Sequence, residues 1–134
     1  MHCSIESDFS NVKKLSVALQ LFCTNEMVDN ELSGQLELML VEAVNNVIEH
    51  AYQNEQGLPI EVEFTASKST IMLIIKDHGK PIPSSIIKTE AKMPETSELP
   101  EGGWGLALIH SLSDDIKHYT EAGTNTLVLS KNRQ

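Results

Sequence analysis

The stretch VEAVNNVIEHAY (residues 41–52) ends the most strongly periodic segment of the chain. Between Glu31 and Tyr52, apolar residues recur at i, i+3, i+4 and i+7, the spacing of one helix with a buried stripe. The stripe consists of Leu36, Met39, Leu40, Ala43, Val44, Val47 and Ala51. The residues that fall on the opposite side are Glu42, Asn46, Glu49 and His50. The sequence therefore predicts a long helix that packs by one face and carries a carboxylate and a carboxamide one turn apart on the other.

A second helix and two strands are predicted on either side of this segment. Ser10 or Asn11 can cap a helix that runs to about Asn25, with apolar residues at helical spacing. The alternating residues 60–64 and the apolar residues 71–75 are typical of two neighbouring strands. We expect the second of these strands to be central and buried.

The C-terminal part of the chain predicts a long loop, a short helix and two more strands. Residues 81–102 contain four prolines and little periodicity, which is typical of a long loop of the kind that often forms a lid. A short helix should begin at Gly103-Trp104-Gly105, and strands should follow near 116–120 and 126–130. The expected order is βααββαββ, with no bounds assigned to the first strand.

The composition is that of an acidic chain sized for one domain. At 134 residues and 40% hydrophobic, the chain fits a single domain over 1–134. Nineteen acidic against ten basic residues give a formal net charge of −9, so we expect neither nucleic acid nor anionic lipid as a partner. The chain has no signal-peptide pattern and no apolar run near the ~20 residues of a membrane span. We therefore expect a cytoplasmic protein without membrane contact.

Glu42 and Asn46 have side chains suited to a metal-nucleotide site, although two polar residues one turn apart are usually a solvated helix face. A neutral Asn46 carboxamide can hold Mg²⁺ and leave the charge of the metal to bound phosphates. Glu42 can accept a proton from an attacking hydroxyl or water. His50 lies near this face and can contact phosphate, with a surface histidine as the equally good alternative.

Asp77-His78-Gly79 follows the expected buried strand, where an aspartate is more often part of a turn. Its functional interpretation is adenine binding. A carboxylate can accept a hydrogen bond from the adenine amino group, whereas guanine carries a carbonyl at that position. Gly79 would then let the backbone approach the ring, because a Cβ there would intrude.

Gly103 and Gly105 precede the expected short helix, where exposed backbone N–H groups can hold phosphate. A plain turn from loop to helix explains the two glycines equally well. Lys88 and Lys92 in the expected lid are candidates to reach phosphate, with solvated lysines as the more common alternative.

Together these residues resemble the nucleotide-binding boxes of the GHKL ATPases, a family of gyrase, heat-shock chaperone, histidine kinase and mismatch-repair types. The motifs are Glu42-x-x-x-Asn46, Asp77-x-Gly79, Gly103-x-Gly105 and Gly123-Thr124-Asn125-Thr126. Residues 41–52 and 102–109 are similar to the boxes of one subfamily, the small anti-sigma factor serine-protein kinases of bacteria. The resemblance covers essentially the whole chain.

The resemblance implies an α/β fold of the Bergerat type, a two-layer sandwich in which helices cover one face of a mixed, mostly antiparallel sheet. It also implies ATP and Mg²⁺ as ligands, with Asn46 on the metal and Glu42 as catalytic base. The implied ATP-binding residues are Asn46, His50, Asp77, Gly79, Gly103, Gly105, Leu106 and Thr126. Thr124 also qualifies for the last box, and Thr126 is favoured because it directly precedes the final apolar strand. Pro81 departs from the broader family, which carries a second glycine there.

In function, the resemblance implies a kinase that phosphorylates a serine of a STAS-type anti-sigma factor antagonist. In its other state such a protein holds a sigma factor or an analogous target, and members are commonly homodimers. Two rival functions stay open. One is a nucleotide-dependent binding module that transfers no phosphate, which would not need Glu42 as a base. The other is the catalytic domain of a histidine kinase acting in trans, although no histidine of the chain lies in a phosphoacceptor pattern.

Overall fold

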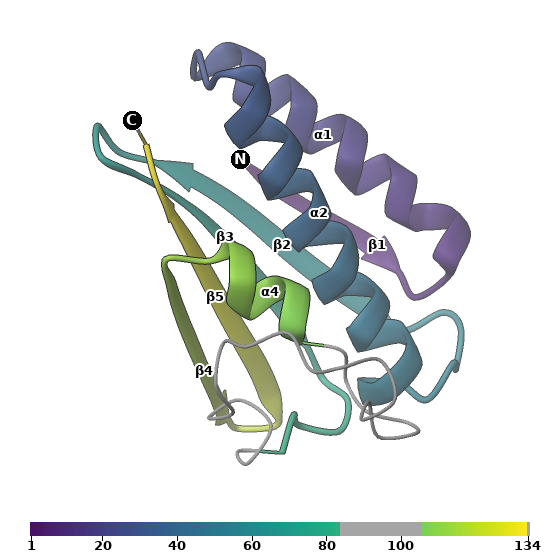
Figure 1. The fold of residues 1–134 in the computed structure, drawn as a ribbon. Coiled ribbons are helices and arrows are strands. Elements are labelled where there is room, and N and C mark those ends of the chain that lie inside the picture. The colour runs from purple at the N-terminus through teal and green to yellow at the C-terminus, as the bar shows by residue number, and fades with distance from the viewer. Residues whose placement is uncertain (84–105, 134) are drawn as a thin grey trace, which may run out of the picture.

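The computed structural model describes residues 1–83 and 106–133 (Figure 1). Its elements in chain order are β1 (His2–Glu6), a 3₁₀ turn (Phe9–Asn11), α1 (Val12–Asn25), α2 (Asn30–Asn46), a π-helical segment (Val47–Ala51), β2 (Pro59–Ala66), β3 (Thr70–Asp77), α4 (Ala107–Leu112), β4 (Asp115–Glu121) and β5 (Thr124–Asn132). This is the expected order of strands and helices, and it confirms the two predicted pairs of strands.

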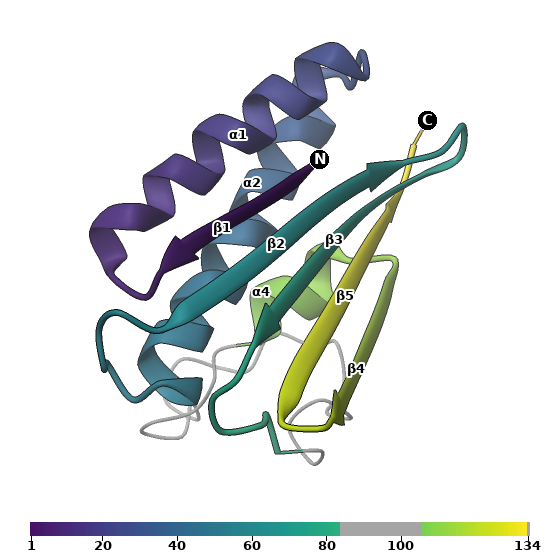
Figure 2. The same cartoon turned by 180° about the vertical axis from the view of Figure 1, so that it is seen from behind.

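The five strands form one sheet in the order β1-β2-β3-β5-β4, and every neighbouring pair is antiparallel. The sheet described here is therefore antiparallel throughout, where a mixed sheet was expected. The helices α1, α2 and α4 all cover the same face, and none of the described helices lies on the opposite face (Figures 1 and 2). The two-layer α/β sandwich is confirmed.

The strand β3 is central, as predicted, but it is buried on one face only. Its residues alternate, with Ile71, Leu73, Ile75 and Asp77 buried toward the helices. The residues between them, such as Ile74, are only partly covered because they lie on the bare face of the sheet. The antiparallel register with β5 pairs Asp77 with Asn125 at one end of the sheet.

The helix α2 is shorter than the helix predicted over residues 31–52. Asp29 caps it, since its carboxylate accepts a hydrogen bond from Leu32 N at 2.8 Å. The α-helix ends at Asn46, and a π-helical segment closes with Tyr52 N donating to Val47 O at 2.8 Å. Such π segments inside helices are rare and occur frequently at functional sites. Here the segment sets the direction of the chain where α2 meets the end of β3.

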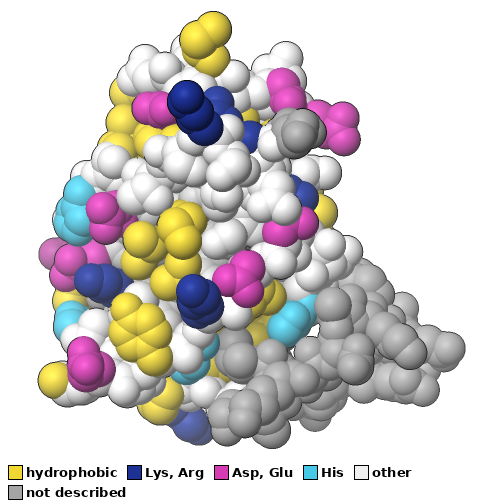
Figure 3. Space-filling view, turned by 90° about the vertical axis from the view of Figure 1, so that its left-hand side faces the viewer, with side chains coloured by type: hydrophobic (Ala, Val, Ile, Leu, Met, Phe, Trp, Pro, Cys, Tyr) yellow, Lys and Arg dark blue, Asp and Glu magenta, His cyan; other side chains and the backbone are white. Residues whose placement is uncertain are grey.

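The surface agrees with the acidic, mixed composition. On the face shown in Figure 3, Lys and Arg side chains are scattered singly among Asp and Glu and form no large patch. Within the described part of the chain, none of the helices combines the length and the apolar character that a bilayer span requires.

The two faces of β3 allow a matched test of the layer arrangement. Replacing Ile71, which is 0% exposed, by Ala should lower the free energy of unfolding by about 2–5 kcal/mol, because the cavity lies between sheet and helices. Replacing Ile74 on the bare face by Ala should cost roughly 1 kcal/mol, the range of strand preference alone. Urea unfolding of both variants measures the difference. Equal losses would show that the bare face is as well packed as the helix-covered one.

Candidate functional site

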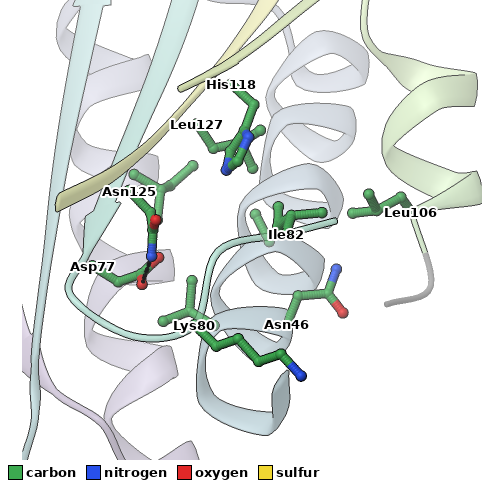
Figure 4. Close-up of a pocket in the computed structure, with 11 residues that line it drawn as sticks. Asn46, Asp77, Lys80, Ile82, Leu106, His118, Asn125 and Leu127 are labelled. Carbon is green, nitrogen blue, oxygen red and sulfur yellow. Dashed lines mark hydrogen bonds between the residues drawn. The ribbon is translucent and has the colours of Figure 1, made fainter. Parts of the chain in front are cut away.

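A pocket lies where the C-terminal end of α2 faces the ends of β3 and β5 (Figure 4). Apolar side chains from α2, β3 and β5 line much of it. The polar and charged side chains that line it are Asn46, Asp77, Lys80, His118 and Asn125. The strands and α2 thus bring together three of the expected motifs, those around Asn46, Asp77 and Asn125.

Asp77 is held at the bottom of this pocket by one oxygen of its carboxylate. Its Oδ1 accepts hydrogen bonds from Gly79 N at 2.8 Å and from Asn125 Nδ2 at 2.8 Å. Its Oδ2 accepts none from the residues that the structure describes. Burial raises the pKa of Asp77 above its ordinary value, and the hydrogen bonds from Asn125 and Gly79 oppose this rise. The carboxylate therefore has one oxygen fixed by the protein and one available to a ligand.

A glycine is needed at position 79 because its backbone lies close against the π-helical segment that follows α2. A Cβ added at this position would overlap Ala51 O and would lie 2.9 Å from Tyr52 Cδ1. The adjacent Lys80 N donates to Ala51 O at 2.8 Å, which holds the two segments together. Close packing against the π-helical segment is therefore one reason for a glycine here, and room for a purine ring stays a prediction.

Tyr52 fixes the same loop from another side. Its Oη donates to Pro59 O at 2.6 Å and accepts from His78 N at 2.9 Å. The hydroxyl therefore links the first residue of β2 to the segment that follows Asp77. Sequence analysis assigned Tyr52 only to the end of a helix, because no local pattern reports a contact between residues 26 positions apart.

The C-terminal motif places Asn125, rather than either threonine, beside Asp77. Leu127 and Leu129 are buried against the helices, so Asn125 shares their face and Thr126 lies on the other face of the sheet. Thr126 is buried there, paired with Lys76. Asn125 was missed by sequence analysis, although the alternation of the two leucines carried the signal.

Thr124 lies at the beginning of β5, outside the pocket lining. Its Oγ1 is 3.3 Å from His78 Nδ1. Asn125 is further tied by its Oδ1, which accepts from Thr120 Oγ1 at 2.7 Å, and by its Nδ2, which also donates to Gly79 O at 2.9 Å. From this motif, therefore, the side chain that lines the pocket is that of Asn125, and both ends of its carboxamide already form hydrogen bonds.

Asn46 is buried, which corrects its predicted place on the polar side of the helix. It is 5% exposed, and its Nδ2 has no hydrogen-bond partner among the described residues. The helix is covered beyond its apolar stripe because Leu106 and Ile82 pack over the same pocket (Figure 4). A buried polar atom without a partner is costly and calls for a ligand or a water to satisfy it.

Glu42, one turn before Asn46, is half-buried and lies outside the pocket lining. Burial raises the pKa of its carboxyl group, and the negative charge of Glu49 raises it further. A carboxylate with a raised pKa is a stronger proton acceptor, which suits a general base. Glu49 itself is exposed, as predicted.

The other predicted site residues divide between described and undescribed parts. Leu106 is 6% exposed and lines the pocket, and its role in ATP binding stays a prediction. His50 lies outside the described lining, with its Nε2 3.8 Å from Glu49 Oε2. Of the predicted lid, 81–102, only residues 81–83 are described. The positions outside the described residues are Lys88, Lys92, Gly103 and Gly105.

A histidine that sequence analysis did not assign also lines the pocket. His118 extends from β4 toward α2 (Figure 4), and its Nε2 is buried without a partner among the described residues. Burial lowers the pKa of His118, opposed by the negative charge of Asp77. The strand alternation of β4 is weak in the sequence, so no pattern singled out this residue.

Comparison with known proteins identifies the fold family. A family model described as "Histidine kinase-like ATPase domain" matches residues 5–131. The chain belongs to this family. The match includes both long helices, all of β2, β3 and β4 and most of β5, so the pocket described above lies wholly within a histidine kinase-like ATPase domain.

Relatives with similar sequences carry kinase and anti-sigma names. The serine-protein kinase RsbW of Oceanobacillus iheyensis is 33% identical over 100 residues, covering 72% of this chain and 63% of that protein. The anti-sigma F factor of Anoxybacillus flavithermus is 26% identical over 94 residues, covering 70% and 64%. The chain thus spans less than two thirds of the length of these curated relatives.

A solved structure supports the fold alone. A chain in the crystal structure of the SiaB-SiaC complex from Pseudomonas aeruginosa superposes with a TM-score of 0.72 at 12% identity. The match covers 96% of this chain and 88% of that one. At this identity the likeness concerns the histidine kinase-like ATPase architecture and not the partners.

The buried carboxyl group of Asp77 should make stability depend on pH. Because its pKa is raised in the folded state, that state binds the proton more tightly than the unfolded chain, and stability falls as pH rises from about 4 through the raised pKa. Asp77→Asn keeps an acceptor oxygen but cannot ionise. The unfolding free energy of the parent relative to this variant should therefore decrease across that interval.

Urea unfolding at a series of pH values measures this difference. Asp115→Asn, which removes a carboxylate from the exposed side of β4, controls for the change in net charge. A difference that stays constant or rises with pH would mean that the hydrogen bonds to Asp77 outweigh its burial.

Proposed function

We propose that this chain binds ATP with Mg²⁺ and transfers the γ-phosphoryl group to a serine of a STAS-type anti-sigma factor antagonist. The observation that carries the proposal is one pocket lined by two buried polar groups whose hydrogen-bonding capacity the described residues do not fully use. Within the described residues, no donor reaches Asp77 Oδ2, and the carboxamide of Asn46 has an Nδ2 without a partner. Both belong to motifs that follow the order of the family's nucleotide boxes.

The residues present fit a magnesium nucleotide. Among the described residues, no cluster of three or more His, Cys, Asp and Glu side chains is arranged to hold a metal ion. Mg²⁺ bound to a nucleotide needs few protein ligands, because phosphates and waters supply the others. The amide oxygen of Asn46 would be the protein ligand. When bound there, the metal would neutralise the negative charge of the phosphates.

Entry of the base requires a change in the pocket. The enclosed space between the described side chains is about 10 Å³, room for a single water. Leu106 and Ile82, which border residues 84–105 on either side, stand over this space (Figure 4). A purine ring therefore enters only when these apolar side chains move apart.

In the proposed reaction, Glu42 acts as the general base. The serine hydroxyl attacks the γ-phosphorus in line with the bond to the bridging β,γ-oxygen. That bond breaks, ADP leaves, and Glu42 takes the hydroxyl proton. Glu42 lies one turn from Asn46, so the proton acceptor and the metal ligand are neighbours on the same helix. Catalysis would be mainly positioning and charge neutralisation.

The proposed partners follow from the family and the names of relatives. The kinase RsbW and anti-sigma F factor names support a partner switch in which this chain holds a sigma factor or analogous target in one state. We propose a homodimer acting in the cytoplasm. The alternative is a nucleotide-dependent binding module without phosphoryl transfer.

The central experiment separates these two functions. The protein is mixed with γ-³²P-ATP, Mg²⁺ and a candidate STAS protein from the same genome, and phosphoserine is measured on that candidate. Label on serine is the result expected of the kinase. A complex that depends on nucleotide but carries no label would instead establish the binding module.

Two substitutions on α2 should separate chemistry from binding. Glu42→Gln should lower the rate of transfer by about 10²–10⁴ and leave ATP binding intact, since it removes only the proton acceptor. Asn46→Ala should weaken Mg-ATP binding itself. Single-turnover phosphorylation and calorimetric titration measure the two effects. Transfer at the parental rate by Glu42→Gln would make the base assignment wrong.

Glu49→Gln is the matched control for Glu42→Gln, because Glu49 is an exposed neighbour on the same helical segment. The rate at neutral pH should be unchanged. Removing the Glu49 charge takes away one cause of the raised pKa of Glu42, so the acid limb of the rate profile should shift to lower pH. A profile identical to that of the parent would mean that Glu42 titration does not control the rate.

A further inference from the structure

The bottom of the pocket offers few atoms to a bound base, because most of its polar groups are already engaged. Asn125 uses its Nδ2 for Asp77 and Gly79 and its Oδ1 for Thr120. Asp77 Oδ1 is taken by two donors. Within the described residues, the polar atoms near the sheet that remain for a ligand are Asp77 Oδ2 and His118 Nε2.

His118 is placed to meet the same ligand as Asp77. It lies on β4 opposite Leu127, which itself lines the pocket two residues after Asn125 on β5. The lowered pKa leaves the ring neutral at pH 7, with a single N–H. A buried ring nitrogen without a partner costs free energy, and a ligand in this pocket would satisfy it.

Adenine presents a pattern that these two atoms match. Its amino group is a donor, and the ring nitrogens on either side, N1 and N7, are acceptors. Asp77 Oδ2 can only accept, and an Nε2–H tautomer of His118 can only donate at that atom. Guanine has a carbonyl in place of the amino group, so an acceptor such as Asp77 would repel it.

We propose that His118 is a second residue of the nucleotide site that recognises the adenine base. Asp77 accepts a hydrogen bond from the adenine amino group, and the Nε2–H of His118 donates to a ring nitrogen beside that group. The inference rests on the proposed ATP site and deepens it. Selectivity for adenine then comes from an acceptor on β3 and a donor on β4, the two strands that flank β5 and its Asn125.

The test uses two replacements of His118 and one control. His118→Phe keeps a ring and removes the donor, and His118→Gln places an amide donor near the Nε2 position. His110→Phe is the control, because His110 Nε2 is also buried without a described partner but lies outside the pocket lining. Dissociation constants are measured by calorimetry for ATP, GTP, 1-deaza-ATP and 7-deaza-ATP.

We expect His118→Phe to weaken ATP binding about tenfold, the loss of one hydrogen bond, and to leave GTP binding unchanged. The ATP dissociation constant of His118→Gln should stay within about threefold of that of the parent, and the constant of His110→Phe should equal that of the parent. One deaza analogue should bind the parent about tenfold more weakly than ATP, and His118→Phe should bind that analogue and ATP equally. Equal ATP affinity in the parent and His118→Phe would overturn the inference.

A second measurement does not depend on the variants. Ring ¹⁵N shifts of His118 in ¹⁵N-histidine protein should report the Nε2–H tautomer in the ATP complex, and an Nδ1–H tautomer would overturn the inference. If the parent binds no nucleotide, the proposed function fails as well. If the parent binds ATP and the His118 variants bind it equally, only the role of His118 is wrong.

Discussion

The close approach of Gly79 to the π-helical segment after α2 is the constraint on which the pocket depends. Lys80 N donates to Ala51 O at 2.8 Å, and there is no room at Gly79 for a Cβ. The π-helical segment provides this contact, because Ala51 is its last residue and its carbonyl accepts the hydrogen bond from Lys80. Sheet and helix layers are thereby fixed to each other at the site, and Asp77 is held between them.

The same region concentrates polar groups that reduce stability. Of the four buried side-chain atoms without a partner among the described residues, Asn46 Nδ2 and His118 Nε2 line this pocket. Each such atom costs about 1–3 kcal/mol, and the buried carboxyl group of Asp77 adds a further cost. Most of the other buried residues are hydrophobic and form one core cluster. A local loss of stability of this kind is expected at a binding site, where a bound ligand supplies the missing hydrogen bonds.

Periodicity was sufficient for the architecture but not for the environment of individual side chains. The stripe from Leu36 to Ala51 is buried throughout, and all four predicted strands formed with extended bounds. Asn46 was placed on a polar face because a helical pattern reports one packing partner, whereas segments distant in sequence cover α2 on a second side.

The remaining differences between the predicted and the observed site depend on which residues of each strand face the helices. Thr126 was favoured for its position before an apolar strand, but in a strand only every second residue faces the helices. Leu127 and Leu129 fix that phase and bring Asn125 to Asp77. Tyr52 and His118 act through contacts between distant segments, which a single sequence does not encode locally. Asp77 was found because it ends a strand whose inward residues are unmistakably apolar.

The different depths of Glu42 and Asn46 bear on what kind of substrate the proposed kinase accepts. Asn46 is almost fully buried inside the pocket, while Glu42, one turn earlier, is half-buried and lies outside the lining. Because Glu42 and Asn46 are one turn apart on α2, a nucleotide whose metal is held by Asn46 would have its phosphates near Glu42. A base in that position can reach a hydroxyl presented from solvent by another protein. Its partial burial also raises the pKa of Glu42, which strengthens it as a proton acceptor without closing the site to a macromolecular substrate.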